Sequence, residues 1–228
     1  MDNYLIISCI FGETFHNVYP APSNNCFFFT NNNKLKQVII DKGWVYVFVD
    51  FPISDFKQSS IQSKYIKFLV FLKDYPEFSK FNKIIYYDHK INMTYYWLTR
   101  AIELSRNNQN YSVIIRKTPK IKRKIWDEVK AAMGQPRYSD SMDKTKIFIN
   151  DTIRNNQDIS ENIRICRTGL LIYNNYENIK PMLEKIYKSC IDLNQPECQI
   201  FWGLFSQQYS NKILMIENKS LNPDWVCP

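Results

Sequence analysis

The sequence predicts an α/β fold in which helices flank a mostly parallel central sheet. Short segments rich in β-branched and aromatic residues recur along the chain, and amphipathic helical patterns fall between most of them. Most of these segments are apolar throughout, which is typical of strands buried on both faces of a sheet. The 228 residues are 45% apolar and 15% aromatic, and they show no repeat or linker. We therefore expect one domain spanning 1–228.

The expected strands are bounded by polar or turn-forming residues. They are LIISCIF (5–11), CFFFT (26–30), WVYVFVDF (44–51), KIIYYD (83–88), SVIIRK (112–117), GLLIYN (169–174) and ILMIE (213–217).

The expected helices carry apolar residues at helical spacing. Ser59 or Ser60 can cap the first of them, and Thr118 can cap the third, where Pro119 fits the first turn. Residues 135–165 are polar, irregular and rich in Asn and Asp, so we expect a long loop or excursion there. The expected helices cover 60–73, 93–106, 118–133 and 176–190, and a last one begins near 194–196.

Composition narrows the classes of function. The net charge of +8, from 30 basic and 22 acidic residues, favours anionic partners. Six cysteines form no CxxC pair and only two histidines are present, which argues against a zinc site. No apolar run approaches the roughly 20 residues of a membrane span, and the N-terminus lacks the features of a signal peptide, so we expect a cytoplasmic protein.

Polar residues follow several of the predicted strands. In open α/β sheets, ligands bind beyond the carboxyl ends of parallel strands, so these residues should converge on one edge. Gly12 also permits close backbone approach. The first strand ends in Phe11, Gly12 and Glu13, the second in Thr30, Asn31 and Asn32, the third at Asp50, and the fourth in Asp88, His89 and Lys90.

The charges near this edge suit a diphosphate. Lys64 and Lys67 share one side of the helix that leads into the fourth strand, away from its apolar stripe. Lys90 is a point charge suited to a phosphate, and Asp88 is suited to a divalent cation or a sugar hydroxyl. The alternatives are a solvated turn at 88–90 and an exposed helix face at 64–67.

Several short motifs together resemble a known family. In their order and spacing they are similar to the nucleotide-sugar-dependent glycosyltransferases with the GT-A fold. The narrower resemblance is to the compact group found in large-DNA-virus capsid glycosylation, bacterial capsule loci and plant Golgi proteins. The motifs are IFG (10–12), CFFFTNN (26–32), SKYIK (63–67), KDYPEF followed by KIIYYDHKI, RTGLLIYNN (167–175) and PECQIFW (196–202).

The resemblance implies a single GT-A-like, Rossmann-like domain and a set of donor-binding residues. Phe11, Gly12 and Thr30 would lie beside the nucleoside, with Asn31 where the family usually has an acid. Lys64 and Lys67 would neutralise the diphosphate, and Asp88, His89 and Lys90 would complete the donor site.

The resemblance also bears on metal use. Asp88 would bind a metal, the donor ribose or the donor sugar, and Mn²⁺ or Mg²⁺ is the ion to consider. Lys90 stands where the family often has a second acid or Asn, and two carboxylates hold a divalent ion better than one. We therefore expect weak or absent metal dependence, with the lysines stabilising the departing nucleotide.

Candidate residues for catalysis and acceptor binding come from later motifs. Glu197 is the candidate general base because PECQ falls near the family's Asp-Gln, although Cys198 is an alternative match and Glu197 also suits a helix start. Asp88 is the second candidate catalytic residue. Arg116 or Lys117 would face the acceptor.

The expected activity is that of a hexosyl- or deoxyhexosyltransferase. It would move a sugar from a nucleotide-sugar, with UDP the expected nucleotide, to a glycan or protein-glycan acceptor, in the host cytoplasm if the chain is viral. The alternatives are a basic nucleic-acid-binding protein, a nucleotidyltransferase and an inert sugar-nucleotide-binding module. No helix-turn-helix, RNP or zinc-finger pattern supports a nucleic-acid-binding protein. The sequence also has no Gly-rich phosphate loop, which argues against dinucleotide-binding enzymes and P-loop NTPases.

Overall fold

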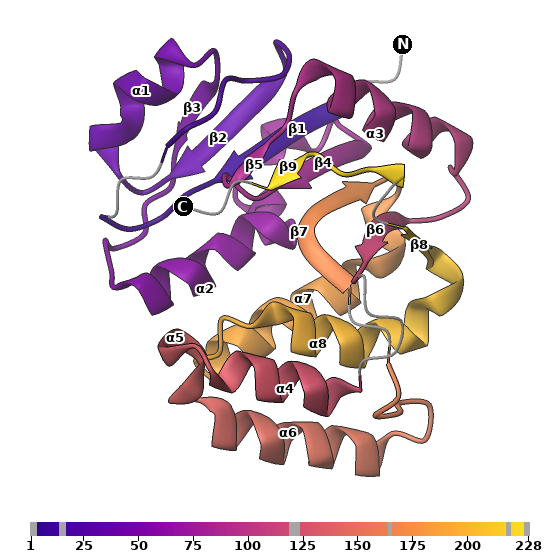
Figure 1. The fold of residues 1–228 in the computed structure, drawn as a ribbon. Coiled ribbons are helices and arrows are strands. Elements are labelled where there is room, and N and C mark those ends of the chain that lie inside the picture. Colours follow the sequence, from indigo (N-terminus) through magenta and orange to yellow (C-terminus); the bar gives the residue numbers. More distant parts are fainter. Residues whose placement is uncertain (1–3, 14–16, 119–123, 164–165, 218–219, 226–228) are drawn as a thin grey trace.

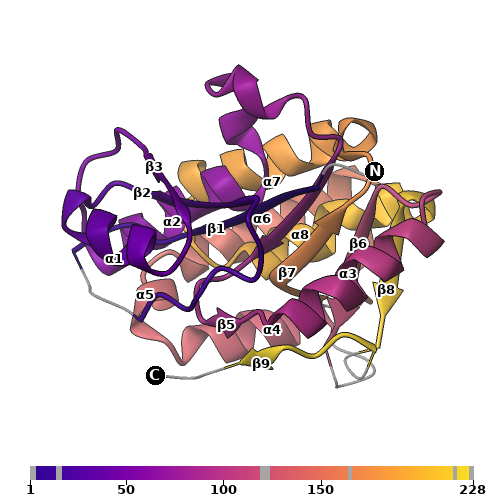
Figure 2. The ribbon, with the colours of Figure 1, turned by 90° about the horizontal axis from the view of Figure 1, so that it is seen from above.

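A computed structural model describes the chain except residues 1–3, 14–16, 119–123, 164–165, 218–219 and 226–228. Its centre is a seven-stranded sheet with the order β3-β2-β1-β4-β7-β6-β8 (Figure 1). A separate two-stranded ribbon joins β5 and β9 (Figure 2). The strands are β1 (Tyr4–Cys9), β2 (Cys26–Thr30), β3 (Val45–Phe48), β4 (Lys83–Tyr87), β5 (Ile91–Asn92), β6 (Val113–Lys117), β7 (Cys166–Tyr173), β8 (Ile213–Ile216) and β9 (Asp224–Trp225).

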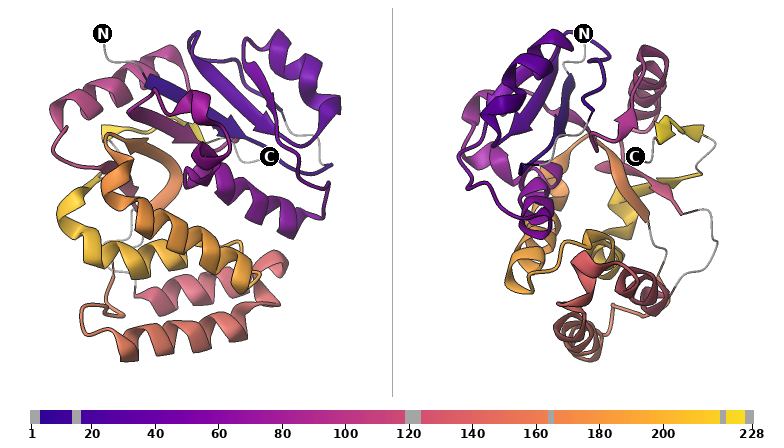
Figure 3. Two further views of the ribbon diagram at one scale, coloured as in Figure 1. Left: turned by 180° about the vertical axis from the view of Figure 1, so that it is seen from behind. Right: turned by 60° about the vertical axis from the view of Figure 1, so that its left-hand side comes forward.

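Two layers of helices enclose the sheet. Buried residues of α1 and α3 pack on one face, and those of α2, α7 and α8 pack on the other (Figure 1). Helix α4 lies outside α8, and α6 is the outermost helix on that side (Figure 3). The helices are α1 (Lys36–Asp41), α2 (Phe56–Lys67), α3 (Tyr95–Asn107), α4 (Ile125–Met133), α5 (Pro136–Ser139), α6 (Met142–Asn155), α7 (Lys180–Asp192) and α8 (Cys198–Phe205), with short 3-10 helices at Asn33–Leu35, Val70–Lys73, Pro76–Phe78, Tyr176–Ile179 and Ser206–Lys212.

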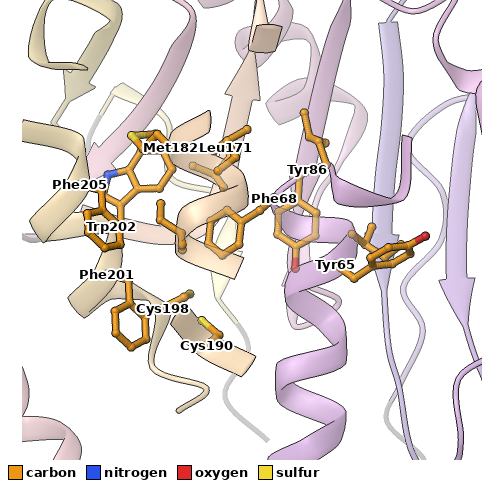
Figure 4. Packing of buried hydrophobic residues seen from close by; sticks show 14 of the residues in the cluster. Tyr65, Phe68, Tyr86, Leu171, Met182, Cys190, Cys198, Phe201, Trp202 and Phe205 are labelled. Carbon is orange, nitrogen blue, oxygen red and sulfur yellow. The ribbon is translucent and has the colours of Figure 1, made fainter. Parts of the chain in front are cut away.

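The alternation of each central strand divides the core between the two faces of the sheet. In β1, Leu5 and Ile7 pack on the α2 side, whereas Ile6 packs on the α3 side. On the α2 side, the rings of Phe68 and Trp202 stack with their centroids 6.3 Å apart (Figure 4). Trp202 is fully buried, so α8 is a core helix of this layer.

The predicted α/β fold with a mostly parallel sheet is confirmed. Strands β3, β2, β1 and β4 are parallel neighbours, and β6 is parallel to β8. Strand β7 is antiparallel to both β4 and β6, so it alone in this sheet runs in the opposite direction. Six strands therefore end at the edge where β7 begins. The prediction for 44–51 was too long, because β3 is a short edge strand with Val45 46% exposed.

The predicted helices exist, but several boundaries were wrong. Helix α2 begins four residues earlier than expected, because the Asp55 carboxylate accepts a hydrogen bond from the Gln58 N–H (2.8 Å) and caps it in place of Ser59 or Ser60. It ends at Lys67, before Leu69 takes a left-handed conformation with φ 58°.

The later helices also differ in their boundaries. Helix α4 begins at Ile125 and not at Thr118, and Pro119, with the rest of 119–123, lies outside the described residues. The last predicted helix begins at Cys198, a little beyond the expected start.

The prediction of a loop over 135–165 was wrong, because this segment contains α5 and the 14-residue helix α6. Helix α6 buries only Met142, Thr145 and Ile149, so its apolar stripe is too narrow to stand out in a polar sequence. In the part of the chain that the structure describes, no helix combines the length and apolarity needed to cross a membrane.

Candidate functional site

A cavity of about 810 Å³ opens at the edge of the sheet where the parallel strands end. One wall comes from α2 and from the residues that follow β1 and β4. The opposite wall comes from the start of β7, from α4 and α5, and from the start of α8. Of the residues predicted to form the site, those that line this cavity are Phe11, Lys64, Lys67, Asp88, His89, Lys90 and Glu197.

Asp88 and Lys67 form an ion pair at the wall of the cavity. Lys67 Nζ lies 3.0 Å from Asp88 Oδ1, and the two side chains are 5% and 25% exposed. The Tyr86 hydroxyl donates a hydrogen bond to the same Asp88 oxygen at 2.6 Å. The Lys67 ammonium also lies 5.3 Å from the centroid of the Tyr86 ring, within cation–π distance.

The pair stays charged. Burial alone would raise the pKa of Asp88, but the Lys67 ammonium, the hydrogen bond from Tyr86 and the charge of Lys64 outweigh it, so that pKa lies below its ordinary value. Burial alone would lower the pKa of Lys67, and the attraction of Asp88 reverses this, so that pKa lies above its ordinary value. A carboxylate and an ammonium therefore face the cavity at neutral pH.

Lys64 brings a second buried ammonium to the cavity. The residue is 6% exposed, and its Nζ donates to Ser63 Oγ at 3.3 Å. Among the described residues, no carboxylate forms an ion pair with it. Because a buried charge is costly unless it is paired, the position of Lys64 would favour an anionic group beside it.

The residues after β4 continue this wall. The His89 ring Nδ1 lies 3.2 Å from the carbonyl oxygen of Cys9, which holds the imidazole against the end of β1. Lys90 also lines the cavity, so three lysines and one aspartate surround this part of it.

A network of side chains on the opposite wall includes Glu197. Its Oε1 accepts hydrogen bonds from the Gln199 backbone N–H (3.2 Å) and side-chain Nε2 (3.3 Å), so it caps α8. The Gln199 amide also donates to Glu128 Oε1 at 3.3 Å. Glu128 and Glu197 are both buried and both line the cavity, and this places two carboxylates opposite the lysines of α2.

Three of the predicted donor residues lie behind the cavity and do not line it. The Asn31 side chain accepts from the Gly12 N–H at 2.9 Å and donates to the carbonyl oxygens of Phe51 and Pro52, so its amide is used within the loops. Thr30 is fully buried. At Gly12, with φ +94°, a Cβ atom would lie 2.4 Å from Ser59 Oγ, so glycine permits α2 to approach the end of β1.

Neither predicted acceptor residue lines the cavity. Lys117 is ion-paired with Glu217 at 2.7 Å. Arg116 is 1% exposed, in the strand beside Arg167 of β7.

Apart from Glu197, sequence reasoning missed the cavity residues on the opposite wall. Arg167 precedes the predicted strand 169–174, and Glu128 lies in the predicted helix 118–133, to which no site residue was assigned. Arg137 and Tyr138 belong to the segment expected to be a loop. The Arg-Thr-Gly sequence before the apolar run of β7 could have indicated Arg167. It indicates the site only if β7 is antiparallel to its neighbours, because the start of β7 then lies at the edge where the other strands end.

The donor set does not suit a divalent metal ion. Within the described ranges, no group of three or more His, Cys, Asp or Glu residues is placed to hold one. Asp88 already has an ammonium as its counter-ion. Hard divalent ions take several oxygen ligands, and this wall offers the carboxylate of Asp88 among lysines.

No family model matches the sequence, and no curated protein sequence matches it. Among solved structures, the chain is similar to the apo form of mouse xyloside xylosyltransferase 1, with 11% identity, a TM-score of 0.49, and coverage of 94% of this chain and 85% of that one. It is also similar to CMP:2-keto-3-deoxy-manno-octonic acid synthetase complexed with CTP, with 9% identity, a TM-score of 0.46, and coverage of 94% and 89%. A third is 4-diphosphocytidyl-2C-methyl-D-erythritol synthase from Anaerococcus prevotii, with 8% identity, a TM-score of 0.44, and coverage of 97% and 91%. Similarity at this level does not indicate what this chain binds or which reaction it catalyses.

Proposed function

We propose that this protein is a glycosyltransferase that binds a nucleoside diphosphate sugar, with UDP as the nucleotide, and transfers a hexosyl or deoxyhexosyl group to a glycan acceptor. The observation that carries the proposal is the pair of buried lysines, Lys64 and Lys67, at the wall of one cavity with Asp88 and Lys90. A diphosphate supplies the negative charge that this wall lacks.

In the proposed reaction, the lysine wall stabilises the leaving group and the opposite wall accepts a proton. An acceptor hydroxyl attacks the anomeric carbon of the donor as the bond from that carbon to the diphosphate oxygen breaks. Negative charge then grows on the departing diphosphate, beside Lys64, Lys67 and Lys90, which stabilise it. Glu197, on the opposite wall, is the candidate base that takes the proton of the acceptor hydroxyl.

In this proposal Lys67 supplies the charge that a divalent ion would otherwise bring to the diphosphate. Asp88 holds the Lys67 ammonium in position through the ion pair at its Oδ1 atom. Its Oδ2 atom, which has no hydrogen bond from another described residue, is available for a donor hydroxyl.

Titration calorimetry with UDP, UDP-glucose, GDP-mannose and dTDP-glucose tests the proposal. We expect the UDP compounds to bind, and Lys64→Met to weaken binding about ten- to a hundredfold, as loss of charge-assisted contacts typically does. Lys188→Met is the matched control, because Lys188 is 74% exposed and pairs with Asp192 on the surface of α7.

Two results would overturn the proposal. The first is the absence of heat with every sugar nucleotide, with salt-dependent binding of a random oligonucleotide instead. The second is UDP-sugar binding that Lys64→Met leaves unchanged. Turnover of CTP with a sugar phosphate, without sugar transfer, would assign nucleotidyl transfer in place of glycosyl transfer.

A further inference from the structure

Two arginines face each other at the edge of the sheet that carries the cavity. Arg116 of β6 is directly opposite Arg167 of β7, beyond an irregularity in the register after Ile115. Opposite residues on antiparallel strands place their side chains on the same face, with Cβ atoms about 4.5–5.5 Å apart. Arg167 lines the cavity, and so does Thr118, two residues beyond Arg116. Arg116 does not itself line the cavity, but it pairs in the sheet with Arg167, which does.

The charges of this pair are not balanced within the described part of the chain. Arg116 is 1% exposed, yet its Nε and Nη2 atoms have no hydrogen-bond partner there. Among the described residues, no carboxylate forms an ion pair with Arg116 or with Arg167. Burial, and then the neighbouring Arg167, lower the pKa of Arg116 to about 10, while Asp88 opposes the shift. The Arg116 guanidinium is therefore charged at neutral pH.

This arrangement destabilises the protein unless a ligand compensates for it. Like charges directly opposite each other in a sheet repel, and an unpaired buried charge is costly. Buried polar groups without partners are uncommon in native proteins, and charged groups under such strain cluster at functional sites. The missing component has a defined chemistry, because the planar guanidinium fork matches a carboxylate or a phosphate in a bidentate manner.

We propose that Arg116 and Arg167 form an oxyanion subsite, and that the acceptor is an anionic glycan carrying a carboxylate, phosphate or sulfate group. This assignment of the acceptor rests on the proposed glycosyl transfer. Of the lysines assigned to the donor diphosphate, Lys64 and Lys67 come from α2 and Lys90 follows β4, whereas both arginines come from β6 and β7. The proposal therefore assigns the two anions to different groups of basic side chains.

Direct binding of simple sugars tests the subsite without turnover. Calorimetry at constant ionic strength would compare glucuronic acid, glucose 6-phosphate and glucose. We expect at least one anionic sugar to bind at least about tenfold more tightly than glucose, as charge-assisted contacts typically provide, and the better of the two identifies the carboxylate or the phosphate as the preferred group. Equal binding of all three sugars, or of none, would overturn the subsite.

Variants then test which residues are responsible. Arg167→Gln should weaken binding of the anionic sugar about ten- to a hundredfold. Arg154→Gln, which removes the same charge from an exposed pair with Asp151, should leave binding unchanged. Unaltered binding in Arg167→Gln would refute the assignment.

A second variant separates binding from a structural role. Arg116→Met keeps the buried volume but removes the unpaired charge, so it should melt no lower than the wild type while losing affinity for the anionic sugar. A lower melting temperature with normal affinity would mean that Arg116 is a structural residue and would overturn its place in the subsite.

Measurements of UDP binding distinguish failure of this inference from failure of the proposed function. UDP affinity should be the same in Arg167→Gln as in the wild type, and glucuronic acid should not compete with UDP. If UDP affinity falls or competition occurs, the arginines bind the donor and the subsite is wrong, although the glycosyltransferase assignment stands. If UDP never binds but anionic sugars do so through Arg167, the subsite stands and the proposed function fails.

Discussion

Replacing Lys67 by methionine tests the ion pair at the cavity wall. Lys67 Nζ lies 3.0 Å from Asp88 Oδ1, and the lysine side chain is 5% exposed. Removing one partner of a buried pair typically costs about 3–5 kcal/mol, because the remaining charge is left desolvated. Asp88 is 25% exposed and keeps the Tyr86 hydroxyl, so we expect the lower end, a loss of about 3 kcal/mol in the free energy of unfolding at pH 7.

The loss should depend on pH in a defined direction. In the wild type the pKa of Asp88 is lower in the folded state, so the pair stabilises the protein above the unfolded pKa of about 4, and this contribution is lost as the pH falls through the folded pKa. In Lys67→Met we expect burial to outweigh the remaining hydrogen bond from Tyr86 and the charge of Lys64, so that the pKa of Asp88 moves above the unfolded value. The carboxylate then destabilises the variant at neutral pH, and protonation relieves this as the pH falls. The deficit should therefore be largest near pH 7 and smaller at pH 4.

Urea unfolding followed by circular dichroism at both pH values measures the deficit. The double variant Lys67→Met/Asp88→Asn leaves neither member of this pair as an unpaired buried charge, so it should lie within about 1 kcal/mol of the wild type at pH 7. A deficit of equal size at pH 4 and pH 7, or a double variant less stable than Lys67→Met, would show that Lys67 acts through packing and would refute the electrostatic reasoning.

Other perturbations have defined outcomes. Gly12→Ala should lower the free energy of unfolding by about 2–4 kcal/mol in urea titrations, because its Cβ would meet Ser59 Oγ at 2.4 Å in a left-handed backbone; unchanged stability would contradict the close approach of α2. Glu197→Gln keeps an oxygen for the cap of α8, so stability should stay within about 0.5 kcal/mol while steady-state turnover falls about a hundredfold; near-normal turnover would remove Glu197 from the mechanism. Saturating EDTA should leave transfer from UDP-sugar unaffected, because Lys67 already supplies the charge, and complete loss restored by manganese would contradict this.

The strands could be predicted because strands buried on both faces are continuous runs of apolar, β-rich residues. The β4 segment Lys83–Tyr87 is buried throughout and reads as a continuous β-rich run. The reversal of β7 could not be predicted, because a central strand covered on both faces has the same apolar pattern in either direction. Helix α6 was missed for the opposite reason, since an outermost helix needs only a narrow apolar stripe.

Some residues of the candidate site could likewise be predicted from the sequence, and others could not. The rule that ligands bind beyond parallel strand ends led to Asp88 and Lys90, and helical spacing placed Lys64 and Lys67 together. Apart from Glu197, which the PECQ motif indicated, the opposite wall depends on tertiary packing of α4 and α8, which leaves no local signature. The loop residue Asn31 was assigned to the ligand, but its amide joins Gly12 to the carbonyl oxygens of Phe51 and Pro52.

The position of β7 in the sheet has a consequence for biosynthesis. Strand β4 pairs with β1 on one side and with β7 on the other, so its second edge remains open until the ribosome has made Cys166 and the residues after it. An open apolar edge is a template for pairing with other chains. The nascent protein is therefore most exposed to misassembly between the completion of β4 and the emergence of β7, and a pause in translation inside that interval should lower the yield of folded protein.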